Sequence, residues 1–339
     1  MSGKCFILFA YVLYVGVFKI VDAQHGQPIK RARNPHISTT SFTRSPAIPD
    51  RKTCGFQDPH FQYAVGDPTE SRLPIGKMPR LRVVGGIETS LEEHPWMALL
   101  GYKNRSGAFN WKCGGTLISQ RYVLTAAHCV TGSIEDVYGK LTYVKLGVHN
   151  STTLISCDIH RDCNEKTVIR GIESFSFHKN YDKTKAATPN DIAVIRLNQT
   201  VEYSTYIRPI CLAEPYEESK INDRLTTVGW GKTENGECSQ VKLKVDVPLR
   251  TNQYCTEQYI KKLLIIILSD SQICAGGEQG RDTCDGDGGG PLLRLTDNGK
   301  QWYQEGIIIG GVSDCLAGLP GIYTKVSRFL SWIHSHVKE

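Results

Sequence analysis

The sequence has 339 residues and a formal net charge of +6. Its basic residues are scattered along the chain, which argues against nucleic acid as a partner, and the cluster of Lys30, Arg31 and Arg33 is typical of a solvated tail. No apolar run reaches the roughly 20 residues that a membrane span requires, so we expect no membrane-embedded segment in the mature chain.

Residues 1–23 have the pattern of a secretory signal peptide. Lys4 precedes an apolar run from Cys5 to Val17, and Val21-Asp22-Ala23 forms a small-residue exit. We therefore expect a secreted, extracellular protein. Because that compartment is oxidising, the cysteines are interpreted as a disulfide framework and not as metal ligands.

The remaining chain divides into a polar segment and an apolar, strand-rich region. Residues 24–82 are rich in Pro, Arg, Ser and Thr and contain only Cys54, which predicts a flexible pro-segment. Short apolar runs separated by turn residues then predict an all-β barrel or sandwich, at 97–100, 123–125, 192–195 and 306–309. A C-terminal helix is predicted by apolar residues at helical spacing, namely Val326, Phe329, Leu330, Ile333 and Val337.

Four separated motifs resemble the chymotrypsin and trypsin family. They are Arg82 followed by Val83-Val84-Gly85-Gly86, Thr125-Ala126-Ala127-His128-Cys129, Asn190-Asp191-Ile192-Ala193, and Gly286-Asp287-Gly288-Gly289-Gly290-Pro291-Leu292. They occur in the family's chain order. The resemblance implies that residues 83–339 form two antiparallel six-stranded β-barrels with a C-terminal helix and a site in the cleft between the barrels.

One position departs from the family's motif in a way that bears directly on activity. The resemblance makes His128 the general base and Asp191 the residue that orients it, with Gly288 standing where the family has its nucleophilic serine. A glycine has no hydroxyl with which to form an acyl-enzyme. We therefore expect a relic catalytic site, and His128 and Asp191 have the alternative role of a hydrogen-bonded pair that supports the barrel interface.

The resemblance also implies roles for the surrounding residues. Gly286 and Gly288 match the oxyanion hole, and the specificity pocket is matched by Asp282, Gly311 and Gly321. Asp282 would hold an Arg or Lys side chain, or it is a pocket aspartate without a productive ligand because Gly310 has replaced a wall of the groove. Cleavage after Arg82 would free the amine of Val83 to pair with Asp287 and reorder nearby loops, as in a zymogen.

A second departure lies in the strand at 306–310. By alignment Ile309 replaces a serine that hydrogen-bonds the catalytic aspartate, and Gly310 replaces an aromatic wall of the substrate groove. Both changes indicate that the cleft differs from that of the family at positions other than the missing serine.

The family's disulfides account for ten of the eleven cysteines beyond Cys5. The implied pairs are Cys54–Cys211, Cys113–Cys129, Cys157–Cys163, Cys255–Cys274 and Cys284–Cys315. Cys238 is left over, either as a buried thiol or in an intermolecular bridge.

The Cys157–Cys163 loop and the Thr53-Cys54-Gly55 linker resemble the arthropod clip-domain proteases and their inactive homologs, which act in melanisation and Toll-type immune cascades. No complete clip domain is present, because Cys54 is the single cysteine between the signal peptide and Arg82. The resemblance implies a non-catalytic regulator whose partners are an upstream trypsin-like activating protease and other cascade proteases or zymogens. The alternative is an active trypsin-like serine endopeptidase whose sequence carries an inactivating Ser-to-Gly substitution.

Three further features are weaker. No cofactor is expected, although Asp158, Asp162 and Glu165 lie in one loop and are compatible with calcium. Secretion makes three Asn-x-Ser/Thr sequons candidate glycosylation sites, at Asn104, Asn150 and Asn198. The apolar run 263–268 is either a partner-facing patch or a buried strand.

Overall fold

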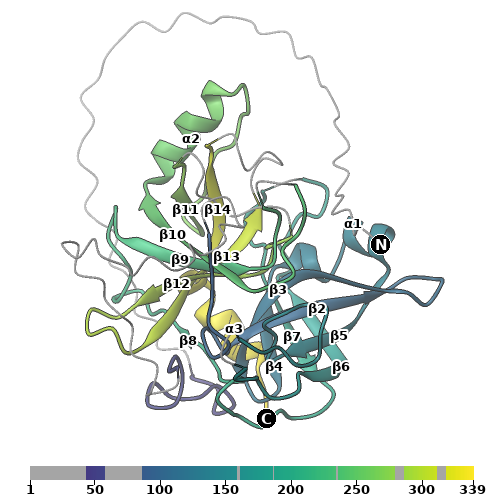
Figure 1. The fold of residues 1–339 in the computed structure, drawn as a ribbon. Helices are drawn as coiled ribbons and strands as arrows, with labels where there is room; N and C mark the ends of the chain where they lie inside the picture. The colour runs from purple at the N-terminus through teal and green to yellow at the C-terminus, as the bar shows by residue number, and fades with distance from the viewer. Residues whose placement is uncertain are drawn as a thin grey trace, which may run out of the picture.

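The fold was analysed in a computed structural model of the chain. The structure describes residues 43–57, 86–158, 161–185, 187–233, 236–278, 286–310 and 318–339. In these ranges the chain forms two antiparallel barrels side by side, linked by long loops and flanked by short helices (Figure 1).

The first barrel is closed by six antiparallel strands in the order β2-β3-β4-β7-β6-β5. The strands are β2 (Met97–Lys103), β3 (Phe109–Ser119), β4 (Tyr122–Thr125), β5 (Lys140–Leu146), β6 (Val168–Phe177) and β7 (Ala193–Leu197). Strand β4 is buried along its whole length, and β2 is buried from Met97 to Tyr102, with Lys103 exposed. The apolar runs at 97–100, 123–125 and 192–195 thus fall on or overlap strands of this barrel.

The second barrel has six strands in the order β10-β11-β14-β13-β12-β9, and it closes because β9 also pairs with β10. The strands are β9 (Arg224–Gly229), β10 (Leu243–Arg250), β11 (Gln272–Gly276), β12 (Pro291–Leu295), β13 (Trp302–Gly310) and β14 (Pro320–Lys325). Two short strands add to its edges, β1 (Ile87–Glu88) on β10 and β8 (Cys211–Leu212) in parallel to β13. The predicted two-barrel fold is confirmed.

The predicted C-terminal helix is confirmed as two consecutive helices, η2 (Val326–Phe329) and α3 (Leu330–His336). Their apolar residues join the largest core cluster, which spans both barrels. The other described helices are η1 (Ala127–Cys129), α1 (Ser133–Tyr138) and α2 (Asn252–Lys261). None of the helices in the described ranges is long and apolar enough to cross a membrane.

The barrels meet at an aromatic cluster. Trp96, directly before β2 of the first barrel, lies 6.3 Å, ring centroid to ring centroid, from Trp302 of the second. The fully buried His94 ring packs edge-on against both. Buried aromatic contacts of this kind contribute packing energy beyond the area they bury. The cluster holds the two barrels in a fixed relation, so residues from both can converge on one site.

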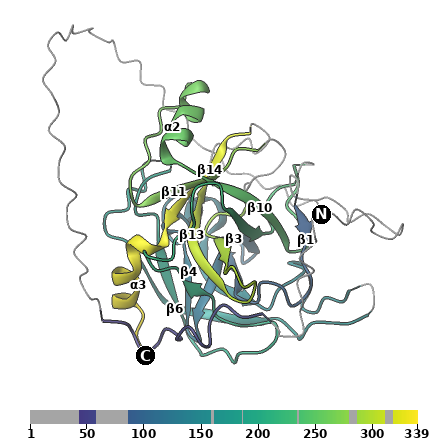
Figure 2. The ribbon, with the colours of Figure 1, turned by 90° about the vertical axis from the view of Figure 1, so that its left-hand side faces the viewer.

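The stretch 43–57, which composition predicts to be flexible, packs on the domain. The Ser45 hydroxyl donates to the Val337 carbonyl (2.6 Å), and the Ser45 amide donates to His334 Nδ1 (3.0 Å). Ile48 enters the main core, and Cys54 is bonded to Cys211. In Figures 1 and 2 this purple segment runs beside the C-terminus. Tertiary contacts therefore order a segment whose own sequence contains no structural signal.

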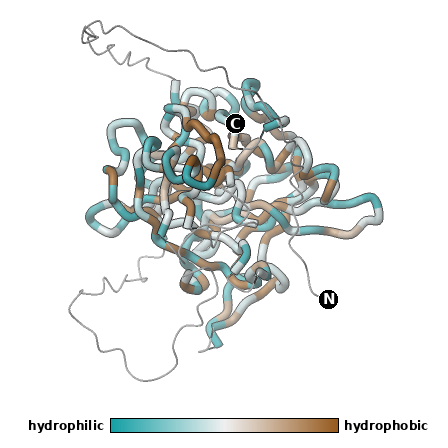
Figure 3. The backbone as a smooth tube through the Cα atoms, turned by 90° about the horizontal axis from the view of Figure 1, so that it is seen from above, coloured by the Kyte–Doolittle hydropathy of each residue, from teal (hydrophilic) through white to brown (hydrophobic). Residues whose placement is uncertain are grey.

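The apolar run at 263–268 is neither a helix nor a strand. Leu264, Ile266 and Leu268 pack against a small cluster that includes Ile309, whereas Leu263, Ile265 and Ile267 are 92%, 84% and 80% exposed. Figure 3 views the molecule from above, so the end that carries α2 in Figure 1 faces the viewer, and brown hydrophobic stretches of the chain lie on this side. The run thus has one packed face and one outward face.

Candidate functional site: a histidine–aspartate pair facing Gly288

The histidine of the site is positioned by η1 and a disulfide. His128 is the middle residue of η1, directly before Cys129, which is bonded to Cys113 of β3. The Cys129 amide donates to the Ala126 carbonyl (3.2 Å) and closes the short helix. The bridge joins the histidine turn to the strand that runs beside it, so the imidazole has little freedom to move.

The aspartate comes from the loop immediately before β7. Asp191 follows Asn190, whose φ of 65° lies in the left-handed region that asparagine tolerates better than most residues. The Asp191 side chain is 4% exposed. Its backbone carbonyl accepts a hydrogen bond from Thr324 Oγ1 (2.7 Å) of β14, so the second barrel helps to fix it.

His128 and Asp191 form a doubly hydrogen-bonded pair. His128 Nδ1 lies 2.7 Å from Asp191 Oδ2, and the His128 amide donates to Asp191 Oδ1 (2.9 Å). Both hydrogen bonds to this carboxylate from the described residues come from His128. Burial by itself lowers the pKa of His128, but the charge and hydrogen bond of Asp191 outweigh it and raise the pKa above 6.5.

The other face of the imidazole is directed at Gly288. A Cβ atom built on Gly288 would lie 2.6 Å from His128 Nε2, closer than non-bonded atoms approach. The ring therefore occupies the space in which a side chain at this position would begin. Within the described ranges, the polar neighbour of Nε2 is the disulfide-bonded sulfur of Cys129 at 3.4 Å, which is not a nucleophile.

The loop that carries Gly288 is held by backbone hydrogen bonds from both barrels. The Gly288 carbonyl accepts from the Gly114 amide of β3 (2.8 Å), and the Gly289 amide donates to the Ile308 carbonyl of β13 (2.8 Å). Gly289 has a φ of 78°, and a Cβ there would overlap Thr125 and Gly114. Gly286, matched to the oxyanion hole, has a φ of 104°. At Gly289 only glycine combines a positive φ with this close packing.

Asp287 belongs to the same loop, and its carboxylate is buried. It is 6% exposed, and Oδ1 accepts a hydrogen bond from the Gly231 amide (2.7 Å). A Cβ on Gly229 or Gly231 would overlap its oxygens. Two glycines thus leave the space that this carboxylate fills.

Several residues expected in the site fall elsewhere or beyond the described ranges. Gly321 is buried in β14, opposite Ala275 of β11. Ile309 is 8% exposed and its side chain joins the cluster of Tyr259, Leu319 and Ile322. Gly310 has a φ of 107°, and no described residue comes within 4 Å of a Cβ built on it. The expected residues outside the described ranges are Arg82, Val83, Asp282, Gly311, Cys284 and Cys315.

The described disulfides are Cys54–Cys211, Cys113–Cys129, Cys157–Cys163 and Cys255–Cys274. Cys238 is half-buried and belongs to none of these four. The three sequon asparagines lie in loops outside the strands, with Asn198 exposed and Asn104 and Asn150 half-buried.

No grouping of Asp158, Asp162 and Glu165 brings three ligand atoms together in the described part of the loop. There, Asp158 Oδ1 accepts from the Asp162 amide (3.0 Å). The single described trio with converging ligand atoms is Cys113, His128 and Cys129. Two of these residues share a disulfide, so the trio does not suit a metal ion.

Two closed antiparallel barrels with a histidine–aspartate pair and a glycine-rich loop between them define the chymotrypsin-like class of proteins. Residues 83–333 match the family model described as Trypsin, and the chain belongs to that family.

The chain is 42% identical over 259 residues to "Phenoloxidase-activating factor 1" of Holotrichia diomphalia, an alignment that covers 76% of this chain and 70% of that protein. It is 39% identical to "CLIP domain-containing serine protease B9" of Anopheles gambiae, over 80% of this chain and 67% of the relative. With "Phenoloxidase-activating factor 3" of Holotrichia diomphalia it shares 38% identity over 99% of this chain and 89% of that protein. Its relatives thus include arthropod proteins named as clip-domain proteases and phenoloxidase-activating factors.

Sequence reasoning missed what occupies the space opposite Gly288. The motif showed that the serine side chain is missing. It did not show whether the space that this side chain would occupy is filled by another group. No local pattern signals this, because the answer depends on the position of a ring 160 residues away.

Proposed function

We propose that this chain is a secreted serine protease homolog without proteolytic activity, and that it acts as a regulator or cofactor in an extracellular proteolytic cascade of the melanisation type. The observation that supports this most directly is the position of the His128 ring, which lies where a side chain at Gly288 would begin. The base and its orienting aspartate are assembled, but glycine offers no oxygen to attack a peptide bond, and the ring fills the adjacent space.

The expected loss of activity is large. In subtilisin, a protease with the same triad chemistry, removal of the serine lowers turnover about 10⁶-fold, a barrier increase of about 8 kcal/mol. The remaining contributions from the oxyanion hole and substrate binding give only ~10³ to 10⁴ over water. Proteolysis at that rate has no physiological value, so the retained architecture serves binding.

We propose that cleavage after Arg82 by an upstream trypsin-like protease switches the chain. The freed amine of Val83 would pair with the buried Asp287 carboxylate, in competition with the Gly231 amide. Because Asp287 belongs to the loop of Gly286 to Gly290, a new ion pair at its carboxylate would shift the loop. The names of the relatives, which include phenoloxidase-activating factors, support partners among cascade proteases and zymogens.

The first test is hydrolysis of an Arg-containing chromogenic substrate after cleavage at Arg82. The unmodified chain and a Gly288→Ser variant are measured side by side, with an active clip-domain protease as the positive control. We expect no turnover by the unmodified chain. Turnover by it would overturn the proposal. Turnover by the Gly288→Ser variant alone would show that the rest of the cleft is competent and that glycine is the single cause of inactivity.

The second test concerns the regulatory role. The cut and uncut chains are added separately to an active clip-domain protease and its zymogen substrate, and the initial rate of zymogen cleavage is recorded. We expect the cut chain to change that rate and the uncut chain to do so less. Equal effects of the two forms would remove the switch, and the absence of any effect would remove the cofactor role.

A further inference from the structure

The apolar run 263–268 presents a row of large hydrophobic side chains to solvent. Leu263, Ile265 and Ile267 are 92%, 84% and 80% exposed, and Ile260 in the last turn of α2 adds a fourth side chain at 52%. Along the run the exposed residues alternate with part-buried ones, as in an extended strand. Soluble proteins rarely expose aliphatic side chains in a contiguous row, so this row has the character of an interaction surface.

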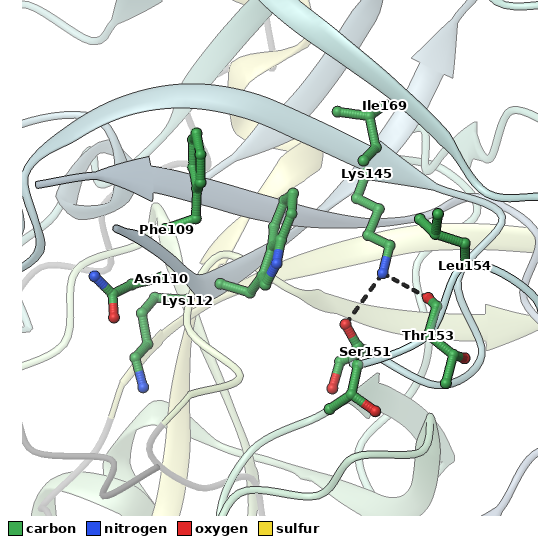
Figure 4. Close-up of a pocket in the computed structure, with 10 residues that line it drawn as sticks. Phe109, Asn110, Lys112, Lys145, Ser151, Thr153, Leu154 and Ile169 are labelled. Carbon is green, nitrogen blue, oxygen red and sulfur yellow. Dashed lines mark hydrogen bonds between the residues drawn. The ribbon is translucent and has the colours of Figure 1, made fainter. Parts of the chain in front are cut away.

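A hollow in the first barrel shows how exposed apolar groups are arranged elsewhere in the described chain. Phe109 lines that hollow together with Lys145, whose Nζ donates to the carbonyls of Ser151 (3.1 Å) and Thr153 (2.8 Å) (Figure 4). Apolar and charged groups thus share the same surface there. The run 263–268 contains only Leu and Ile, so no polar side chain of its own interrupts the exposed row.

The row is held in place at both ends. At its start the Leu264 amide donates to the Tyr259 carbonyl (3.0 Å), and just after its end Asn252 Nδ2 donates to the Ser269 carbonyl (3.1 Å). The even-numbered side chains of the run pack against the cluster that includes Tyr259. Because the backbone is already ordered, burial of the outward row by a partner costs little further conformational entropy.

The two ends of the row carry opposite charges. Lys261 and Lys262 lie directly before it and Asp270 lies just after it, and all three are exposed. In an antiparallel, twofold-symmetric contact between two copies, the basic end of one row meets the acidic end of the other, and this happens twice per dimer. The aliphatic side chains meet between these ends. The row is therefore complementary to itself in both charge and apolar character.

We propose that the chain self-associates through the row of Ile260, Leu263, Ile265 and Ile267. The row packs face to face and antiparallel against the same row of a second copy, with Lys262 beside the acidic end of that copy. Figure 1 shows α2, whose end begins the row, projecting from the second barrel, where a second copy has access. The proposal goes beyond the regulatory role proposed above and does not depend on the missing serine, so its failure would leave the inactive assignment untouched.

The test is sedimentation velocity of the full chain at about 1 to 100 μM, a range suited to an interface of modest size. We expect a concentration-dependent equilibrium between monomer and dimer. Ile265→Asp should raise the dimer Kd at least about a hundredfold, because two carboxylates would be buried in the contact without partners. The variant should fold, with an unchanged urea midpoint, since the side chain that it replaces is exposed.

Ile155→Asp is the matched control. It makes the same substitution at a 51% exposed isoleucine in the loop after β5 of the first barrel, so the loss of apolar surface and the added charge are alike. We expect less than about a twofold effect on the dimer Kd.

A second pair of variants tests the antiparallel arrangement. Lys262→Asp and Asp270→Lys each place like charges at both ends of the contact, and each should weaken the dimer about tenfold. An equimolar mixture of the two variants should form a mixed dimer with a Kd within about threefold of the unmodified chain, because opposite charges meet again.

Three results would overturn the proposal: a chain that stays monomeric over the whole range, a dimer that Ile265→Asp leaves intact, or a mixture of the charge variants that associates no better than either alone. The row would have a different occupant if the monomeric chain bound phosphatidylcholine vesicles or an active clip-domain protease and Ile265→Asp abolished that binding. Either of these results would also overturn self-association.

Discussion

Asp191 accepts two hydrogen bonds from one residue, the backbone amide and the ring Nδ1 of His128. This pairing fixes the tautomer of the imidazole and aims Nε2 at the loop of Gly288. The arrangement is that of a working triad up to the nucleophile, and the position where a side chain would begin is filled by the ring itself.

The first prediction concerns the pKa of His128. We expect a value above 6.5, because the charge of Asp191 outweighs the effect of burial. Asp191→Asn should bring the pKa below 6.5, since burial then acts alone. The measurement is an NMR titration of the His128 Cε1 proton, with Asp297→Asn, an exposed change in the β12–β13 turn, as control.

The same shift has a consequence for stability. A histidine whose pKa is raised on folding contributes stability that is fully present below its unfolded pKa of 6.5 and is lost as the pH rises through the folded value.

The pKa prediction for His128 fails if the Asp191→Asn variant leaves that pKa unchanged, because the ion pair would then not be its cause.

The second prediction concerns the space opposite Gly288. Gly288→Ala should lower the free energy of unfolding by about 1–3 kcal/mol, because the added methyl overlaps the His128 ring. Urea denaturation measures the change. In a His128→Ala background the ring is gone, so the same substitution should cost much less, with a coupling energy of about 0.5–3 kcal/mol. Additive effects of the two changes would mean that the ring and position 288 do not compete for space.

The third prediction concerns the N-terminal segment. After cleavage at Arg82, the segment containing Cys54 should remain attached through Cys54–Cys211. Non-reducing electrophoresis should show an unchanged mass, and reduction should release the fragment. A double Cys54→Ser, Cys211→Ser variant should lose the fragment more readily without reduction, because only non-covalent contacts such as the Gly55 amide to the Pro209 carbonyl (2.8 Å) then hold it. Release of the fragment from the cut wild-type chain without reductant would contradict the bridge.

The fourth prediction concerns acid stability. His334 accepts the Ser45 amide at Nδ1, which requires a neutral acceptor nitrogen, and burial, with a smaller contribution from Arg44, lowers its pKa to about 4. For a histidine with a lowered pKa the stability is present above the unfolded value and is lost as pH falls. We therefore expect the free energy of unfolding to fall between pH 6.5 and about 4 by up to about 3 kcal/mol from this group.

The control for the fourth prediction is His334→Gln, which keeps a hydrogen-bond acceptor near Ser45 but does not titrate. Urea midpoints are compared across the same pH range. The wild-type chain should lose more stability than the variant as pH falls. Parallel curves would show that His334 does not titrate in the folded protein with the lowered pKa.

The family and the two-barrel fold follow from the sequence alone. The chemistry of acyl transfer requires a histidine, an aspartate and close-packed glycines, each within a short sequence motif. The motifs at His128, Asp191 and Gly286–Leu292 can therefore be recognised without a structure. The C-terminal helix is equally legible, because Val326, Phe329, Leu330 and Ile333 must share one buried face.

Other features were decided only by the tertiary structure. The segment 43–57 is polar and aperiodic, and it is ordered because the domain offers partners such as His334 and Cys211. Lys145 alternates with apolar neighbours as a solvent-facing strand residue does, yet the loop 151–154 folds over its ammonium. The glycine at 288 is visible in the sequence, but the ring that fills its space is not. Each of these outcomes depends on atoms brought together across long chain separations, and no local pattern encodes which distant group arrives.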